Sequence, residues 1–388
     1  MVNIVLLHEG EMPTLEETYR SFQYLVKNYK VTITKINSVK FTKNKMKSAD
    51  VIICVRGHSP VTYACLKKAM EYGKKILFLL DDDLKDMPKG SFWYPERKKW
   101  LLRCLGLCDG LMTSNQLIAD EYKQFLKGNQ IVIINTAVAP ETIEKPKEVN
   151  EVVKIVVAAS EWHVDNFERF VKPAFLKLEE KYGNYLEFYF VGLHPAMKEI
   201  RNRQLIHYIP SMGMDDYVDY MRNHKFDIGI AVLVPNHFSE RKYFNKFIEY
   251  TRYGICGIYS KCMPFELVVE DGVNGFFAEN TPKSWYKAIR GAIDNQDIRV
   301  KCIENAQEYL KSKHNEEYLF GKMIKDCPEL ICFKAPNCEM KGIERYLSVW
   351  KVRHIMFRIC ESVYLTFSSL SHFGIKTTLQ KVKRKFNS

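Results

Sequence analysis

The chain has 388 residues, of which 46% are hydrophobic and 27% charged, so it is long for one hydrophobic core and predicts two or three domains. These ordinary globular values exclude a disordered or a collagen-like chain. The net charge of +12 would suit a nucleic acid or an anionic membrane, but no zinc-finger, basic-zipper or RNA-recognition motif accompanies it, and we expect no nucleic-acid partner.

Apolar, β-branched runs alternate with helical patterns through the first part of the chain. A strand over 3–9 begins the series, and Thr14 and Glu17 have the capping-box spacing that predicts a helix to about Tyr29. Later strands are expected at 31–36, 49–56, 74–83, 109–115 and 131–138, with helices between them. Because buried strands that alternate with helices are typical of a covered parallel sheet, the sequence predicts a Rossmann-like domain over 1–140.

The start of the chain and its cysteines indicate the compartment. No basic segment precedes the first apolar run, and Glu9 and Glu11 follow it, so this run is interpreted as a strand and not as a signal peptide. The eleven cysteines have no disulfide-like spacing, and close pairs such as Cys104 and Cys108 lack the second half of a zinc site. We therefore expect a cytoplasmic protein without a structural metal.

A second alternating series follows a polar linker at 141–153. Its strands are expected at 153–160, 186–192, 205–210, 227–233 and 254–260, and its helices at 166–182, 214–223, 242–253 and 282–326. This pattern predicts a second Rossmann-like domain over 154–330. Since ligands of doubly wound sheets bind outside the carboxyl ends of the strands, two such domains in tandem predict a cleft between them as the site.

The last segment, 331–388, is predicted to be a basic helical tail. Over 339–388, ten Lys or Arg stand against three Glu, and aromatic residues are interspersed among them. No stretch of about 18 residues lacks charges, so we do not expect this tail to span a bilayer. Two interpretations stay open: a helix that packs on the protein body, and a basic helix on an anionic membrane surface, which would make the protein peripheral on the inner face of the membrane.

A charged helix expected after the strand over 227–233 carries residues that suit an anion. Lys242 and Lys246 lie near its predicted start, and Glu249, seven residues after Lys242, is expected on the same face. Cations beside free backbone N–H groups suit a diphosphate, and a carboxylate two turns on can accept hydrogen bonds from vicinal hydroxyls. The alternative is an amphipathic surface helix with an ordinary pair of Lys246 and Glu249.

In combination, these residues resemble the nucleotide-sugar half of GT-B glycosyltransferases, the retaining group that has two Rossmann domains. The pattern F-x-x-x-K-x-x-x-K-x-x-E-Y-x-x-x-G runs from Phe238 to Gly254. Further matching residues lie after and before it: Pro264, Glu266, Asp271, Gly272, Asn274, Gly275 and Trp285, and upstream Ser160, His163 and Asp165. The resemblance covers about 150–315 well and reaches the first half only weakly.

The resemblance implies a role for each matching residue. Glu249 would hold the ribose hydroxyls of the donor, and Lys242 and Lys246 would face its phosphates. Further donor ligands would be Glu266, His163 and Asp165. The group commonly places a Glu eight positions before the ribose Glu, to contact the transferred sugar. That position is Arg241 here, with Glu240 one residue earlier, so these two residues are catalytic candidates.

Charged residues also end two strands of the first half. An acidic triplet at 81–83 follows one strand, and Arg56 and His58 follow the strand before it. Such a triplet can bind Mg²⁺ or Mn²⁺ in metal-dependent transferases, can cap a helix, or can orient an acceptor hydroxyl. We favour the last role, with Asp81 as a catalytic residue and with Arg56, His58 and Asp82 as acceptor ligands.

The sequence thus predicts a glycosyltransferase that moves a sugar from a nucleoside-diphosphate-sugar to a saccharide or lipid-linked saccharide acceptor, with retention, without a metal and without a cofactor. Surface polysaccharide or glycolipid assembly is the expected setting. Three alternatives stay open: a nucleotide-sugar epimerase of the same fold, a metal-dependent transferase centred on the acidic triplet, and a catalytically degenerate binding subunit.

Overall fold

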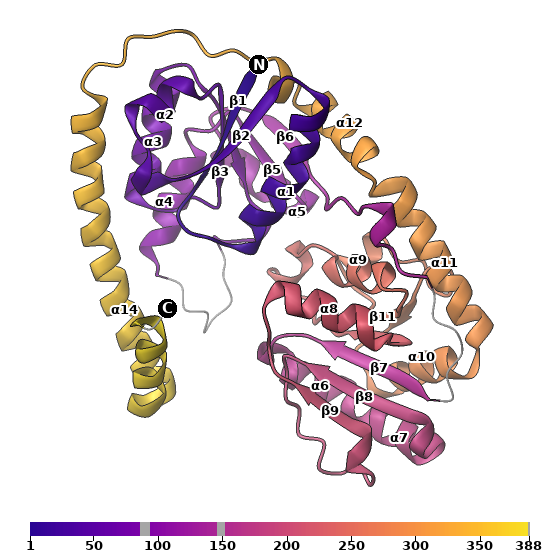
Figure 1. Cartoon of the computed structure of the whole chain (residues 1–388). Coiled ribbons are helices and arrows are strands. Elements are labelled where there is room, and N and C mark those ends of the chain that lie inside the picture. The colour runs from indigo at the N-terminus through magenta and orange to yellow at the C-terminus, as the bar shows by residue number, and fades with distance from the viewer. Residues whose placement is uncertain (86–93, 146–151, 387–388) are drawn as a thin grey trace. The chain divides into compact units, whose positions relative to one another are not determined.

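The chain folds into two compact units, each an α/β body with a parallel six-stranded sheet (Figure 1). The first unit holds Met1–Thr136 and Leu319–Ser388, and the second holds Ala137–Tyr318. The computed structural model describes residues 1–85, 94–145 and 152–386, with side chains of the last helix described to residue 371. The predicted fold class, two Rossmann-like domains with a basic helical tail, is confirmed.

The sheet of the first unit has the strand order β2-β1-β3-β4-β5-β6. Its strands are β1 (Val2–His8), β2 (Val31–Asn37), β3 (Val51–Val55), β4 (Lys75–Leu79), β5 (Gly110–Thr113) and β6 (Gln130–Ile133). The helices that connect them are α1 (Pro13–Asn28), α2 (Lys43–Ser48), α3 (Pro60–Glu71), α4 (Glu96–Leu105) and α5 (Gln116–Tyr122). The order in which strands are added reverses at this point: β2 lies on one side of β1, and β3 lies on the other. Ligands are therefore expected at the carboxyl ends of β1 and β3.

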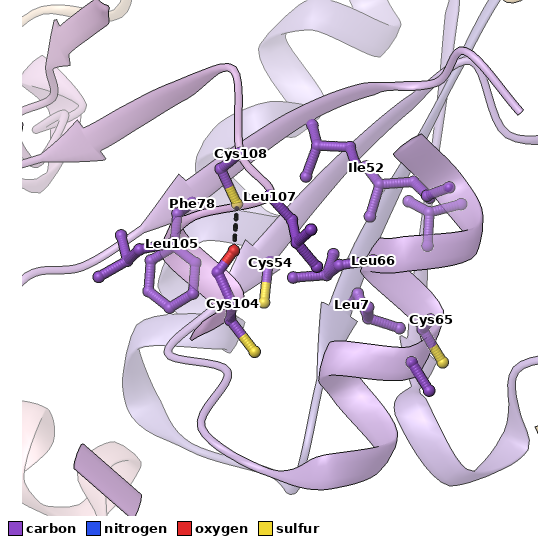
Figure 2. Packing of buried hydrophobic residues seen from close by; sticks show 14 of the residues in the cluster. Leu7, Ile52, Cys54, Cys65, Leu66, Phe78, Cys104, Leu105, Leu107 and Cys108 are labelled. Carbon is purple, nitrogen blue, oxygen red and sulfur yellow. Dashed lines mark hydrogen bonds between the residues drawn. The ribbon is translucent and has the colours of Figure 1, made fainter. Parts of the chain in front are cut away.

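Buried aliphatic side chains of the strands meet those of α3 and α4 in the core of the first unit. Figure 2 shows Leu7 and Ile52 from the strands near Leu66 from α3, and Phe78 from β4 near Leu105 from α4. Buried cysteines fill the remaining space: Cys54, Cys65, Cys104 and Cys108. Burial raises the pKa of the Cys65 thiol to about 12, so this thiol stays protonated and acts as a small apolar group.

The sheet of the second unit has the order β12-β11-β10-β7-β8-β9, with its reversal between β7 and β10. Its strands are β7 (Val153–Ala158), β8 (Leu186–Val191), β9 (Ile206–Ile209), β10 (Ile228–Ala231), β11 (Cys256–Ser260) and β12 (Phe276–Ala278). Its helices are α6 (Val164–Phe170), α7 (Lys172–Tyr182), α8 (Met214–His224), α9 (Asn245–Arg252), α10 (Pro282–Asp294) and α11 (Gln296–Lys313). Of the predicted linker at 141–153, residues 146–151 lie outside the described residues.

After the second unit, the chain returns to the first unit before residue 330, the predicted domain boundary. Helices α12 (Glu316–Asp326) and α13 (Glu329–Cys332) contribute Phe320 and Leu330 to the core that contains β1 and α1. The ring of Phe320 stacks on Tyr24 of α1, with 4.8 Å between the ring centroids. Residues 319–330, which the sequence analysis assigned to the second domain, therefore belong to the first, because the apolar face of α12 is buried there.

The tail is one long helix, α14 (Ile343–Phe386), which packs against α3 (Figure 1). Its residues Ile343 and Leu347 are buried in the core of the first unit, and its Trp350 lies 5.7 Å from the ring of Tyr63. In the described part of the chain we find no helix with the length and apolarity that a bilayer crossing requires.

The predicted capping box of α1 is absent from the structure. Met12 is the N-cap residue, and no side chain caps this helix. The hydroxyl of Thr14 instead donates a hydrogen bond of 2.7 Å to Asp81. In a capping box the oxygen of Thr14 would accept a hydrogen bond from a backbone N–H group, whereas here Thr14 lies inside the first turn and its hydroxyl donates to a carboxylate that follows β4.

Candidate functional site

A cavity of about 440 Å³ opens at the carboxyl ends of β7, β8 and β10 in the second unit. It lies where the strand order reverses, the position at which doubly wound sheets bind ligands. Strand-end residues such as Ala158 and Val191 form its apolar floor, and the segment 242–246 forms part of its wall. The fold thus places the predicted donor-binding segment directly beside this cavity.

Gly192 allows the loops after β7 and β8 to approach each other at the rim of the cavity. Its φ of +80° is in the left-handed region, and a Cβ on this residue would lie 2.7 Å from the carbonyl oxygen of Ala159. Only glycine meets both conditions without strain. The backbone of the two loops is therefore exposed to a ligand at close range.

The polar wall of the cavity is cationic. Lys242, Lys246 and His163 line it, and among the described lining residues there is no Asp or Glu. Burial, and then the charges of Lys242 and Lys246, lower the pKa of His163 to about 4, so its ring is neutral at pH 7. The buried Nδ1 atom of His163 has no hydrogen-bond partner among the described residues. The site therefore presents two ammonium groups and an unused ring nitrogen to an anionic ligand.

Helix α9 adds its N-terminus to this wall. Its residues Asn245 and Lys246 line the cavity, and its N-cap residue, Phe244, makes no side-chain hydrogen bond to the first turn. Backbone N–H groups of a helix start carry partial positive charge and suit phosphate oxygens. The lysines and the helix start thus favour the same kind of ligand.

Glu249 lies one turn beyond Lys246 and is held in a small network. Lys246 Nζ lies 2.8 Å from one carboxylate oxygen of Glu249, and the Tyr217 hydroxyl donates a hydrogen bond to the same carboxylate. Lys246 also donates to the hydroxyl oxygen of Tyr217 at 3.1 Å. Burial and then the charge of Glu249 raise the pKa of Tyr217, which keeps this hydroxyl protonated. Tyr217, from α8, was not found in the sequence because its contact with Glu249 is tertiary.

Lys242 precedes α9, contrary to the prediction that it shares a helix face with Glu249. Residues Ser239–Arg241 form a separate 3₁₀ turn. The side chain of Asn236 accepts hydrogen bonds from the backbone N–H groups of Phe238 and Ser239, and this Asx turn ends before α9 starts. Lys242 nevertheless reaches the same cavity from the loop.

Five predicted residues of the second unit are not among the cavity lining residues: Glu249, Asp165, Glu240, Arg241 and Glu266. Asp165 is exposed in the first turn of α6, and Glu266 is exposed in the 3₁₀ turn that follows Pro264. Arg241 donates to the carbonyl oxygen of His237 at 2.7 Å. The structure therefore groups Lys242, Lys246 and His163 at the cavity, joins Glu249 to them through its ion pair with Lys246, and leaves the other four outside that group.

In the first unit, Arg56 ties together the acidic residues that follow β4. Its guanidinium donates to Asp81 at 2.5 and 2.6 Å and to Asp82 at 2.8 Å. Arg56 adopts a φ of +48°, an uncommon conformation for a residue other than glycine. Asp83 points elsewhere and accepts a hydrogen bond of 2.6 Å from Tyr122. Within the described ranges, no three His, Cys, Asp or Glu side chains converge as a metal site.

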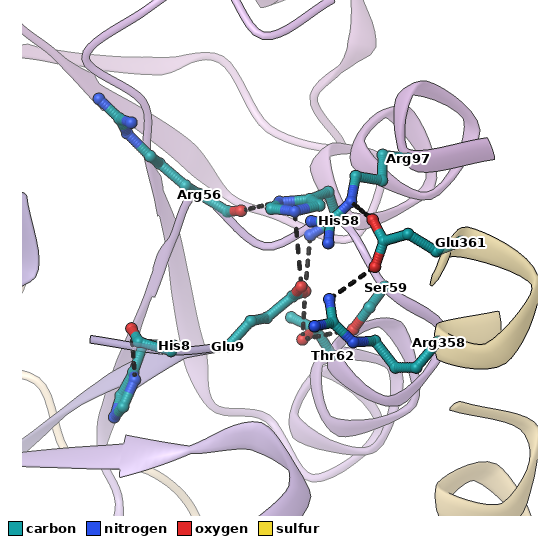
Figure 3. Close-up of polar contacts among 10 residues, drawn as sticks. His8, Glu9, Arg56, His58, Ser59, Thr62, Arg97, Arg358 and Glu361 are labelled. Carbon is teal, nitrogen blue, oxygen red and sulfur yellow. Dashed lines mark hydrogen bonds and ion pairs between the residues drawn. The ribbon is translucent and has the colours of Figure 1, made fainter. Parts of the chain in front are cut away.

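A second charged cluster lies at the reversal point of the first sheet, after β1 and β3 (Figure 3). Glu9 accepts hydrogen bonds of 2.7 Å from the backbone N–H of His58 and from the Thr62 hydroxyl. Burial opposes ionisation of Glu9, but His58 and Thr62 hold its pKa below the ordinary value. Burial lowers the pKa of His58. Glu9 was not among the predicted site residues, although its place directly after a central strand could have indicated it.

The same region is joined to α14 by an ion-pair network. Glu361 of α14 is buried and pairs with Arg97 of α4, and it accepts a hydrogen bond of 2.6 Å from Arg358 (Figure 3). The tail helix is therefore fixed to the first unit by charge as well as by apolar contact.

Comparisons with known proteins identify the fold. No family model and no curated protein sequence matches the chain. Among solved structures, the Anabaena protein HepE in complex with UDP has a TM-score of 0.59 and 12% identity, over 84% of this chain and 100% of that chain. Sucrose-phosphate synthase from Thermosynechococcus elongatus has a TM-score of 0.59 and 10% identity, over 85% and 99% of the two chains.

A glycosyltransferase from Rickettsia africae is also similar, with a TM-score of 0.59 and 14% identity over 85% of this chain and 98% of that chain. A putative UDP-N-acetylglucosamine 2-epimerase from Listeria monocytogenes has a TM-score of 0.51 and 12% identity over 81% and 96%. Together with the two parallel sheets, these matches establish that the chain has the two-domain GT-B fold.

Proposed function

We propose that the protein is a glycosyltransferase that binds a nucleoside-diphosphate-sugar in the cavity of the second unit. The observation that carries this proposal is the cavity at the strand reversal, which is lined by Lys242 and Lys246 and contains no carboxylate among its described lining residues. Two ammonium groups beside a helix N-terminus match the two charges of a diphosphate. Structures of similar fold contain UDP and UDP-glucose, which supports this choice of ligand.

In this proposal the second unit stabilises the leaving group. As the bond between the sugar and the diphosphate breaks, negative charge grows on the diphosphate, and Lys242, Lys246 and the first turn of α9 oppose it. These groups supply the positive charge that a divalent cation would otherwise provide, so we propose transfer without a metal. The acceptor hydroxyl attacks from the face that the diphosphate leaves, which retains the anomeric configuration and needs no covalent intermediate.

Glu249 is proposed to hold the ribose of the donor. It already accepts hydrogen bonds from Tyr217 and Lys246, and these two partners fix the carboxylate next to the cavity wall. A carboxylate has acceptor capacity beyond two hydrogen bonds, so vicinal hydroxyls can still bind to it. Asp165, Glu240, Arg241 and Glu266 stay as proposed contacts to the donor sugar.

The acceptor is proposed to be a saccharide or a lipid-linked saccharide that contacts the strand-end residues of the first unit. Arg56, Asp81, Asp82 and His58 provide donors and acceptors in a cluster that has one guanidinium for two carboxylates. A neutral polyhydroxyl ligand suits such a cluster better than an anion does. Surface polysaccharide or glycolipid assembly is the proposed setting.

An epimerase is the second candidate, since a putative nucleotide-sugar epimerase is among the proteins of similar fold. The test is to incubate the full chain with a set of nucleotide sugars, with and without a mixed saccharide and lipid-linked saccharide acceptor, and with and without EDTA. Release of the nucleoside diphosphate that depends on the acceptor, resists EDTA and falls in Glu249→Ala supports the transferase. Formation of a new sugar epimer without an acceptor supports the epimerase, and binding without any product supports a degenerate subunit.

A further inference from the structure

The tail helix α14 has an apolar face that no described part of the protein covers. The exposed residues share one side of the helix at spacings of three and four: Val349, Val352, Ile355, Met356, Ile359, Val363 and Phe367. The opposite side carries Ile343, Leu347 and Phe357, which are buried on the first unit. We call the first set the outer face of α14. A helix that is apolar on two opposite sides is packed on one of them and has a second surface for a partner.

The inner contacts hold this outer face in a fixed orientation. Trp350 packs against Tyr63 and Trp100, with ring centroids 5.7 and 6.0 Å apart. About two helical turns further on, the ring of Phe357 lies 5.4 Å from that of Tyr94. Over this stretch α14 cannot rotate to bury its outer face on the first unit without losing these contacts.

The charges on α14 are arranged for an anionic partner. Over 343–386 the sequence has nine Lys or Arg and two Glu. Both carboxylates are turned to the first unit: Glu344 accepts a hydrogen bond of 2.7 Å from the backbone N–H of Lys43, and Glu361 is buried between Arg97 and Arg358. The outer face therefore shows apolar side chains and no carboxylate among its described side chains, with the exposed Arg345 one turn before Val349, whereas the guanidinium of Arg353 lies over the rings of Trp100 and Trp350 on the inner side.

We infer that the outer face of α14 docks on an anionic lipid bilayer, with the helix lying in the plane of the interface. Exposed apolar residues bordered by Lys and Arg are the features that hold amphipathic helices at this depth. A second copy of the chain fits less well, because a self-paired α14 would bring like charges together without the acidic residues that usually pair across such a seam. The inference goes beyond the proposed function and does not rest on it.

Sedimentation of the full-length protein with vesicles tests the inference, in the absence of any donor or acceptor. The vesicles are phosphatidylcholine alone, or phosphatidylcholine with about 30% phosphatidylserine. The test variant is Ile355→Glu with Ile359→Glu, on the outer face. The matched control is Val26→Glu with Ile298→Glu, which adds the same charge at exposed apolar positions on α1 and α11. Ile359 and Ile298 are exposed to a similar degree, 52% and 47%. Thermal unfolding confirms that both variants are folded.

We expect the wild type and the control to bind the anionic vesicles, and the test variant to bind at least about tenfold more weakly. Equal binding by all three proteins, or no binding by the wild type, would overturn the inference. Sedimentation equilibrium without lipid examines the alternative partner: a wild-type dimer that the test variant converts to monomer, without vesicle binding, would assign the outer face to a second copy. Since the transfer assay measures release of the nucleoside diphosphate and uses no vesicles, a failure here leaves the proposed function standing.

Discussion

The two units place charged residues at equivalent points of their sheets but use them in opposite ways. At the strand reversal of the first unit, Arg56 is paired with two aspartates, and Glu9 lies beside His58. At the strand reversal of the second unit, Lys242 and Lys246 line a cavity whose described lining has no carboxylate. The same fold therefore offers a cluster with more carboxylates than cations in one unit, and in the other a cavity at which the charged lining side chains are lysines, one of them also paired with Glu249.

This difference indicates that the second unit is the one suited to an anion. An excess of carboxylates disfavours an anionic ligand, whereas two lysines at a cavity wall attract one, although Lys246 also pairs with Glu249. We therefore expect substitutions in the first cluster to change mainly stability, and substitutions in the second to change mainly nucleotide affinity.

The largest effect is expected from removing the two lysines. Lys242→Ala with Lys246→Ala should weaken binding of the preferred nucleoside diphosphate by about 100-fold or more, because each charged hydrogen bond contributes roughly 1.5 to 3 kcal/mol. Isothermal titration calorimetry measures the change. Lys287→Ala, on the exposed side of α10, is the control and should bind like the wild type. Unchanged affinity in the double variant would remove the lysines from the donor site.

Arg56→Met should act on stability instead. It leaves Asp81 and Asp82 without their cation in a half-buried cluster, and the free energy of unfolding should fall by on the order of 2 kcal/mol. Urea denaturation measures this, with the exposed Arg20→Met as the control. Nucleotide affinity should stay within about twofold of the wild type. A large loss of affinity with unchanged stability would reverse the comparison between the two units.

His163 should give the second unit a pH dependence. Its pKa in the folded protein is about 4, below the ordinary value of 6.5, so on acidification the unfolded chain takes up this proton first. The stability due to neutral His163 is complete above pH 6.5 and is lost as the pH falls toward 4. Between pH 7 and pH 4.5, the free energy of unfolding of the wild type should therefore fall by more than that of His163→Gln. Urea denaturation of both proteins at both pH values measures the difference. Parallel losses would contradict the burial of this ring.

The smallest effect is expected for Tyr217→Phe. The substitution removes one hydrogen bond to Glu249 and keeps the ion pair of Glu249 with Lys246, so the affinity for the nucleotide should fall by about fivefold or less. Isothermal titration calorimetry measures this change in affinity, and Tyr220→Phe, on the same helix, is the control. A loss as large as that of the lysine variant would mean that Tyr217 contacts the ligand itself.

Much of the fold was predictable because the strands are buried, β-branched runs such as Val51–Val55 and Ile228–Ala231 that stand between helical patterns. The domain boundary could not be predicted, because the sequence of α12 does not show which unit buries its apolar face. The packing of Phe320 on Tyr24 places this helix in the first unit. The break between Lys242 and α9 was also missed, because the side chain of Asn236 forms a local turn within a segment of helical composition.

Some residues of the candidate site could likewise be predicted from the sequence, and others could not. Lys242, Lys246 and His163 line one cavity because they lie near one helix start and one strand end, and Glu249 is joined to them through Lys246. Tyr217, Glu9 and Glu361 were not predicted, since each acquires its role from residues far away in the chain. The periodicity of the sequence shows which residues belong to the same helix or strand. Only the assembled sheet shows which strands and helices end at the same edge of the sheet.

Hydrogen exchange read by mass spectrometry, with and without the nucleoside diphosphate that stabilises the protein most in a thermal screen, shows whether the nucleotide binds in the second unit. We expect protection at 159–163, 192–194 and 242–248, without added metal, and little change at 9–14, 56–62 and 81–85. Protection confined to the first-unit segments, or protection that requires a divalent cation and persists in Lys242→Ala with Lys246→Ala, would contradict the assignment of the nucleotide to the second unit.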